Sequence, residues 1–253
     1  MKPTERFSDR VEDYVKYRPH YPETVVDYLR DTYFLSPEWT IADIGSGTGI
    51  SAELFLGKGN LVYGVEPNPD MRKKAEELLG GRFISIDGTA EATGLQGGCV
   101  DLVVAGQAFH WFDPVRSRAE FVRILRPGGV VVLVWNERLI ETGFEQEYEA
   151  LILQYGTDYK TINHKNISDE KIGAFFHPAA FSLAVFPNEQ RFDLAGLKGR
   201  LLSSSYIPKE GPAFAAMIGD LERLFDRHQS DGRVRVGYDT KVYSGIPDEK
   251  THA

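Results

Sequence analysis

The sequence lacks the features that several broad classes of protein depend on. It contains one cysteine, Cys99, so no internal disulfide can form. No segment approaches the ~20 apolar residues that a membrane-spanning helix needs. The opening stretch MKPTERFSDRVEDY also lacks the apolar core of a secretory signal. We therefore expect a cytoplasmic protein that has no membrane partner.

Basic residues are in short supply as well. The 253 residues include 37 acidic and 29 basic side chains, which gives a net charge of −8, and no basic run stands out. A chain of this charge repels a phosphate backbone, so nucleic acid is not an expected partner. The six histidines are scattered without metal-ligand spacing, and no metal is expected. The sequence leaves monomer and homodimer equally open.

Short apolar runs alternate with segments of helical period between residues 40 and 136. Runs rich in Val, Ile and Leu, without polar alternation, are typical of strands that are covered on both faces, as in a parallel sheet. Two later runs predict antiparallel additions, and we expect the last of them at a sheet edge. The predicted strands are 40–44, 61–66, 82–87, 99–105, 130–135, 181–186 and 232–243.

Two of the intervening helices have clear start signals. Asn68 and Asp113 are each followed by proline, the pattern of an N-cap and a first helical residue. The apolar faces that we predict are Met71, Ala75, Leu78 and Leu79 for the first helix and Val115, Ala119, Val122 and Leu125 for the second. Strand and helix in alternation predict a doubly wound, mostly parallel α/β sheet of seven strands, with the last antiparallel.

We expect a single domain over residues 1–253. Residues 1–36 contain two helical stretches that predict a lid, and residues 37–138 form the ligand-binding core. Residues 139–253 supply a substrate wall and the last strands, with a helical insertion near 193–229.

The stretch ADIGSGTG (42–49) predicts a ligand loop after the first strand. In doubly wound sheets the ligand lies beyond the carboxyl ends of the strands, and glycine lets it approach the main chain. The dinucleotide pattern G-x-G-x-x-G fails because Ile50 stands where its third glycine belongs. No Gly-Lys-Ser/Thr follows either, so a P-loop is absent. The loop could still hold either a pyrophosphate or a carboxylate.

Two further acids end the next two strands. Glu66 can accept hydrogen bonds from both hydroxyls of a ribose, and Asp87 can reach an adenine amino group. Together with Asp43, they suit a ligand that carries an ammonium group, a ribose and an adenine but no phosphates.

With these residues the sequence resembles the class I S-adenosylmethionine-dependent methyltransferases, in particular the small-molecule type 11 branch. The resembling stretches are ADIGSGTG, GVEPNPDM, DGTAE, DLVVAGQAFHWFD and RILRPGGVVVLVW. The segments YVKYRPHYP and QAFHWF are similar to those of the trans-aconitate methyltransferase-like group. The resemblance implies a Rossmann-like methyltransferase fold and S-adenosylmethionine as cofactor.

The resemblance also implies roles for individual residues. The methionine part of the cofactor would lie at the loop, the ribose at Glu66 with Asn68 beside it, and the adenine at Asp87 and Gly88. Gln107 belongs to the segment 106–111, which would border the methyl group. The loop residues are Asp43, Gly45, Ser46, Gly47, Thr48 and Gly49.

The N-terminal segment and the segment after the fourth strand offer candidates for catalysis and binding. Tyr14 and Arg18 could fold over the cofactor, or they could serve as core packing and a structural ion pair. His110 could act as a general base, position the substrate, or pack with Trp111 at the strand end. No base is needed if the acceptor is a carboxylate.

The function that we predict is methylation of a small molecule, with O-methylation of a small acid or a hydroxyl compound favoured. Two other classes stay open: an NAD-linked oxidoreductase with the same sheet, and a non-catalytic module that binds S-adenosylmethionine.

Overall fold

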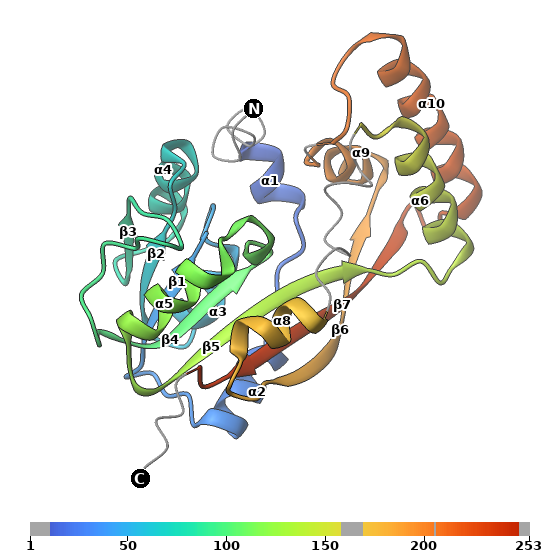
Figure 1. Ribbon diagram of the computed structural model, residues 1–253. Coiled ribbons are helices and arrows are strands. Elements are labelled where there is room, and N and C mark those ends of the chain that lie inside the picture. The colour runs from blue at the N-terminus through green and yellow to red at the C-terminus, as the bar shows by residue number, and fades with distance from the viewer. Residues whose placement is uncertain (1–10, 158–168, 205, 248–253) are drawn as a thin grey trace.

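The computed structural model describes residues 11–157, 169–204 and 206–247, apart from the side chains of residues 11, 13, 14 and 169. Seven strands form one sheet in the order β3-β2-β1-β4-β5-β7-β6. All neighbours from β3 to β5 pair in parallel, and β7 is antiparallel to both β5 and β6 (Figure 1). The predicted doubly wound sheet with an antiparallel last strand is therefore confirmed.

The strands are β1 (Thr40–Ile44), β2 (Leu61–Val65), β3 (Phe83–Ile86), β4 (Val100–Gly106), β5 (Leu125–Arg138), β6 (Ser182–Phe192) and β7 (Val234–Gly245). The predicted edge position of β7 is wrong, because β7 lies between β5 and β6. Its side chains from Val234 to Gly245 are mostly buried, whereas those of β6 alternate between exposed and half-buried. The edge strand at this end of the sheet is therefore β6.

The helices are α1 (Val11–Tyr17), α2 (Thr24–Tyr33), α3 (Ile50–Leu56), α4 (Pro69–Leu78), α5 (Pro114–Ile124), α6 (Gly143–Tyr155), α8 (Asp169–Phe176), α9 (Leu194–Leu202) and α10 (Gly211–His228), with a short 3-10 turn, η3 (Phe109–Trp111). Side chains of α5 and α8 pack on one face of the sheet, and those of α2 and α3 pack on the other. Alternate residues of β1, such as Ile41 and Ala42, belong to these two cores. The continuous apolar runs follow from this two-sided burial.

Both predicted N-caps are present. The side chain of Asn68 accepts hydrogen bonds from the backbone N–H groups of residues 70 and 71, and that of Asp113 accepts from residues 115 and 116. The predicted apolar face of α5 is wrong at Val115, which is 77% exposed, and at Ala119, which is also exposed, whereas Leu125 is buried as predicted. The side chains of α5 that are buried are Ser117, Glu120, Phe121 and Ile124. In α4, Met71 and Ala75 are buried as predicted, but Leu78 is exposed.

A third core lies at one end of the long strands. Helices α6, α9 and α10 pack around the buried ends of β6 and β7, with Leu197, Leu221 and Val236 fully buried among them. Figure 1 shows these helices beyond the end of β5 and shows α1 between α4 and α9. Helix α1 is therefore placed between the carboxyl ends of the first strands and the helical cluster.

Candidate cofactor site

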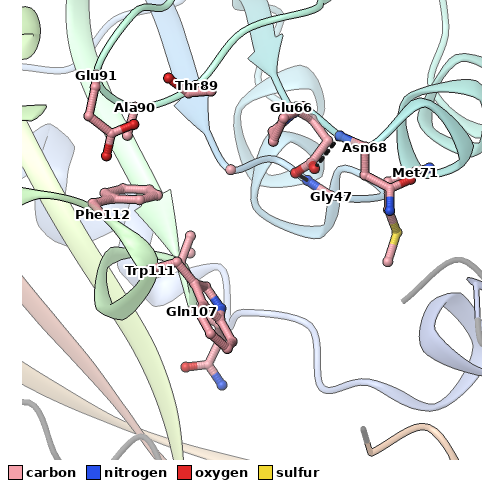
Figure 2. Close-up of a pocket in the computed structure, with 14 residues that line it drawn as sticks. Gly47, Glu66, Asn68, Met71, Thr89, Ala90, Glu91, Gln107, Trp111 and Phe112 are labelled. Atoms are coloured by element: carbon pink, nitrogen blue, oxygen red, sulfur yellow. Dashed lines mark hydrogen bonds between the residues drawn. The ribbon is translucent and has the colours of Figure 1, made fainter. Parts of the chain in front are cut away.

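A cavity of about 280 Å³ opens at the carboxyl ends of β1, β2 and β4, where ligands bind in sheets of this kind. That volume is at the lower end of the range for small-molecule sites. Figure 2 shows side chains that line it from several loops. The lining residues are Gly45, Gly47, Glu66, Pro67, Asn68, Met71, Thr89, Ala90, Glu91, Gly106, Gln107, Ala108, Trp111 and Phe112.

The three glycines of the loop after β1 have different reasons to be glycine. All three have positive φ, of 68° at Gly45, 56° at Gly47 and 90° at Gly49. A Cβ at Gly45 would lie 2.7 Å from Cβ of Ala108, and one at Gly49 would lie 2.2 Å from Leu79. A Cβ at Gly47 would meet nothing within 4 Å. Gly47 therefore leaves open space at the cavity, while the other two fit the loop between its neighbours.

Glu66, which directly follows β2, holds the loop and faces the cavity. One carboxylate oxygen accepts the N–H of Gly47 at 3.0 Å, and the other accepts the N–H of Asn68 at 2.9 Å. Figure 2 shows both bonds. Burial raises the pKa of Glu66, while these two N–H groups and Arg72 counteract the shift. Each oxygen has a further lone pair, so the carboxylate can also accept from two ligand hydroxyls.

Asp43 lies behind the loop and does not line the cavity. Its carboxylate is fully buried, and one oxygen accepts the Ser51 hydroxyl at 2.7 Å. The other oxygen has no hydrogen-bond partner in the part of the chain that the structure describes. Burial raises the pKa of Asp43 to about 7, and the Glu66 charge adds to the shift. Ser46 and Thr48 are buried in the same loop and do not line the cavity either.

Asp87 and Gly88, the predicted adenine contacts, are also outside the lining. The Asp87 carboxylate is 75% exposed and pairs with Arg72 at 3.0 Å. A Cβ at Gly88 would lie 2.7 Å from the carbonyl oxygen of Thr93, so this glycine fits the turn. The cavity is lined here by Thr89, Ala90 and Glu91, which the sequence interpretation did not single out.

Gln107 and Trp111 line the opposite wall of the cavity. Gln107 has a positive φ of 55°, uncommon for a side chain with a Cβ, and its amide donates to the carbonyl of Asn136 at 3.3 Å. His110 is outside the lining, and its ring centre lies 4.7 Å from that of Trp111. Burial lowers the pKa of His110 to about 4. The imidazole is therefore neutral at pH 7 and is a weak base.

Of the two N-terminal candidates, Arg18 is not among the residues that line the cavity. Arg18 donates from Nη2 to the carbonyl oxygen of Ser203 at 3.1 Å, at the carboxyl end of α9. The side chain of Tyr14 lies outside the described part of the structure. The segment between α1 and α2 is instead tied to the far strands, because Asn136 and Asn188 donate to the carbonyl of His20 at 3.3 and 2.7 Å.

Other lining residues could have been found from the sequence. Met71 lies in the first turn of α4, three residues after the Asn68 cap, so it faces the same edge of the sheet as Asn68 does. Glu91 accepts the backbone N–H of Asp113 at 2.8 Å and so joins the loop after β3 to the start of α5. Phe112 directly follows the predicted site residue Trp111. Proximity in sequence to a predicted site residue was the usable signal in each case.

The fold and the cavity fit a cofactor that contains adenosine and lacks a pyrophosphate. The loop offers open space at Gly47, and among the described residues the only charged side chains that line the cavity are the carboxylates Glu66 and Glu91. Two acids would repel a pyrophosphate and suit ribose hydroxyls or a cationic group. In the described ranges, no cluster of His, Cys, Asp or Glu could hold a metal ion. The helices described there include none long and apolar enough to cross a bilayer.

The site and the strand order define the class I methyltransferase fold, and comparison with known proteins agrees. Residues 42–133 match the family described as "Methyltransferase domain". This segment of the chain is therefore similar to methyltransferase domains. The match covers β1 to β4, the cofactor cavity and most of β5.

Relatives extend the likeness beyond this segment. An uncharacterized methyltransferase of Mycobacterium tuberculosis is 35% identical over 146 residues, which are 58% of this chain and 58% of the relative. The chain thus matches little more than half the length of that relative. An uncharacterized methyltransferase-like protein of Schizosaccharomyces pombe is 25% identical over 94% of both chains.

Solved structures with the same fold cover most of the chain. A putative type II methyltransferase from Anaeromyxobacter dehalogenans superposes with a TM-score of 0.62 at 21% identity, covering 91% of this chain and 98% of the other. A putative methyltransferase from an antibiotic biosynthesis pathway of Anabaena variabilis gives 0.60 at 19% identity, covering 91% and 99%. At these identities the likeness shows the fold alone.

Proposed function

We propose that this protein is an S-adenosylmethionine-dependent methyltransferase that acts on a small molecule. The observation that carries the proposal is the Glu66 carboxylate, which both closes the glycine loop through Gly47 and presents acceptor lone pairs to the cavity. When bound, the cofactor supplies a methyl group on a positively charged sulfur. The matched methyltransferase domain supports this cofactor over a dinucleotide.

The residues that line the cavity suggest how the chain would hold its ligand. Glu66 and the Asn68 turn would bind the ribose, and the loop at residues 89–91 would lie against the adenine in place of Asp87. Gln107 and Trp111 would border the reacting end. Methyl transfer is an in-line displacement, so orientation and exclusion of water carry most of the catalysis, and orientation can contribute ~7–11 kcal/mol.

We favour O-methylation of a small acid or hydroxyl compound. A pKa of about 4 makes His110 a poor general base at neutral pH. An acceptor that is already ionised, such as a carboxylate, needs no base. This argument favours acids over alcohols and amines.

Isothermal titration with S-adenosylhomocysteine and with NADH tests the cofactor. We expect S-adenosylhomocysteine to bind and NADH not to bind, and the reverse result would support an oxidoreductase. Incubation with methyl-labelled S-adenosylmethionine and a panel of acids, phenols and amines then tests catalysis. Cofactor binding without transfer to any member would favour a non-catalytic binding module.

A further inference from the structure

Helix α9 carries a buried arginine that forms no ion pair with a carboxylate of the described residues. Arg200 is 9% exposed, and its Nε donates to the hydroxyl of Tyr238 at 3.2 Å while its Nη1 donates to Ser204 at 3.3 Å. Among the described residues, no carboxylate lies within ion-pair distance of Arg200. Burying a charge with only neutral partners costs free energy, and such a charge calls for a counter-ion.

One end of the guanidinium stays available to a ligand. Nη2 of Arg200 makes no hydrogen bond with the described residues. This atom is also not fully buried, so solvent reaches it. Its two N–H groups can therefore bind a ligand. The two hydroxyls hold the other side of the guanidinium fixed, and Tyr238 is itself fixed because its hydroxyl donates to Gln190 at 3.0 Å.

Tyr148 lies near both Arg200 and a second arginine, and the charge of that second arginine is already paired. Tyr148 is buried near Arg200 and Arg138, and the guanidinium of Arg138 lies 5.1 Å from the centre of the Tyr148 ring. Glu149 forms an ion pair with Arg138. With Arg200 included, this group of side chains has a net positive charge in a buried place.

A series of contacts along the sheet connects Arg200 with the cofactor cavity. Gln107, which lines the cavity, bonds to the carbonyl of Asn136, and the side chain of Asn136 bonds to Thr240. Tyr238, which holds Arg200, is two residues from Thr240 on β7 and faces the same side, about 7 Å away at ~3.3 Å per residue. Arg200 thus lies beyond Gln107, on the side away from Glu66.

We propose that Arg200 is the anion-binding residue of the methyl-acceptor site, and that its free Nη2 holds a carboxylate of the acceptor. This inference rests on the proposed methyltransferase function. Contact with Nη2 leaves lone pairs free on the carboxylate, so the role that we assign to Arg200 is to hold the acceptor in place while a second oxygen of the acceptor is methylated. The acceptor class is then a small molecule with a carboxylate at one end and a second oxygen nucleophile at the other.

The test measures binding of propane-1,2,3-tricarboxylate by isothermal titration, to the full chain saturated with S-adenosylhomocysteine. We expect the wild type to bind this anion and not its neutral trimethyl ester. Arg200→Gln should weaken binding at least tenfold, because a charged hydrogen bond is lost. Arg200→Lys should keep part of the affinity. Arg223→Gln is the matched control, since that arginine is 66% exposed on α10 and should leave binding unchanged.

Affinity for S-adenosylhomocysteine and the thermal midpoint are measured for each variant. Both should stay near wild type in Arg200→Lys, which keeps the test valid if Arg200→Gln is unstable. The proposal is overturned if the wild type does not bind the tricarboxylate at 10 mM, or if a folded Arg200→Gln binds it as tightly as the wild type. Failure to bind S-adenosylhomocysteine would instead overturn the cofactor assignment, and the tricarboxylate titration would then be repeated on the chain without it to test Arg200 separately.

Discussion

Replacing Glu66 with glutamine tests the central contact of the cofactor site. The carboxylate accepts N–H groups of Gly47 and Asn68 on separate oxygens. An amide has one acceptor oxygen, so one of these N–H groups would face an NH2 group and lose its partner. A buried N–H left without an acceptor costs about 1–3 kcal/mol. Because burial raises the pKa of Glu66, neutralising the side chain returns part of that cost.

The loss should be larger for ligand binding than for stability. A hydrogen bond from a ribose hydroxyl to a carboxylate is worth about 1.5–3 kcal/mol, and each 1.4 kcal/mol is tenfold in affinity. We therefore expect Glu66→Gln to weaken S-adenosylhomocysteine binding by about ten- to a hundredfold in isothermal titration. Glu77→Gln is the control, because Glu77 is 52% exposed on α4. Binding by Glu66→Gln within threefold of the wild type would refute the role of this carboxylate.

Three further predictions use the same protein. The pKa of Asp43 is raised from 3.8 to about 7, so its contribution to stability is present below pH 4 and is lost as the pH rises through 7. In urea unfolding, the free energy of unfolding of Asp43→Asn relative to that of the wild type should therefore rise by up to about 4 kcal/mol between pH 4 and pH 8. A difference that does not change with pH would contradict the raised pKa. Gly49→Ala should cost at least 1–3 kcal/mol of stability from its left-handed φ and its clash with Leu79. Gly47→Ala should weaken S-adenosylhomocysteine binding more than it weakens the fold, and the opposite ranking in urea unfolding and titration would count against the open space assigned to Gly47. Because the pKa of His110 is about 4, the pH profile of kcat/KM for any acceptor that is turned over should show no ionisation of a histidine between pH 6 and pH 8. An ionisation near pH 6.5 that disappears in His110→Gln would instead support His110 as the general base.

The central strands could be predicted from sequence because their burial is local in origin. Strand β1 has the predicted bounds of 40–44, since it is covered on both faces and has no polar interruption. Strand β5 was predicted at 130–135 but extends from Leu125 to Arg138. Its polar end pairs with β7, up to Arg138 opposite Tyr238. The prediction used apolar runs, so it could not detect a polar segment that becomes a strand by pairing with a distant part of the chain.

The face of α5 shows a different limit. Its start was predicted because a cap and a proline act within three residues. Its buried face includes Glu120, whose carboxylate accepts the hydroxyl of Thr93 at 2.5 Å and pairs with Arg123. A buried, fully paired acid looks like a surface residue in a sequence pattern. Val115 looks like a core residue in the sequence but is exposed, because contacts with the sheet determine which side of α5 is buried.

The site was predictable where residues follow directly from strand ends. Gly47, Glu66 and Asn68 line the cavity as the strand pattern suggests. Asp87 also follows a strand, but its carboxylate is 75% exposed and pairs with Arg72 on the neighbouring helix. The roles assigned to these residues toward the cofactor remain predictions. Arg200 had no signal at all, because its burial depends on α9 meeting β7, two elements whose contact no local pattern reports.

The carboxyl edge of the sheet is divided into two chemically different parts, and Asn136 at β5 marks the boundary. On one side, the tips of β1 and β2 present carboxylates and glycine N–H groups, which suit a ribose and a cationic centre. On the other side, β6 and β7 present amides and hydroxyls that support a guanidinium. Opposite charges on the two sides would orient a cationic methyl donor and an anionic acceptor toward each other across Gln107. An acceptor without negative charge would gain nothing from the second part, so charge on the acceptor should be reflected in KM rather than in cofactor affinity.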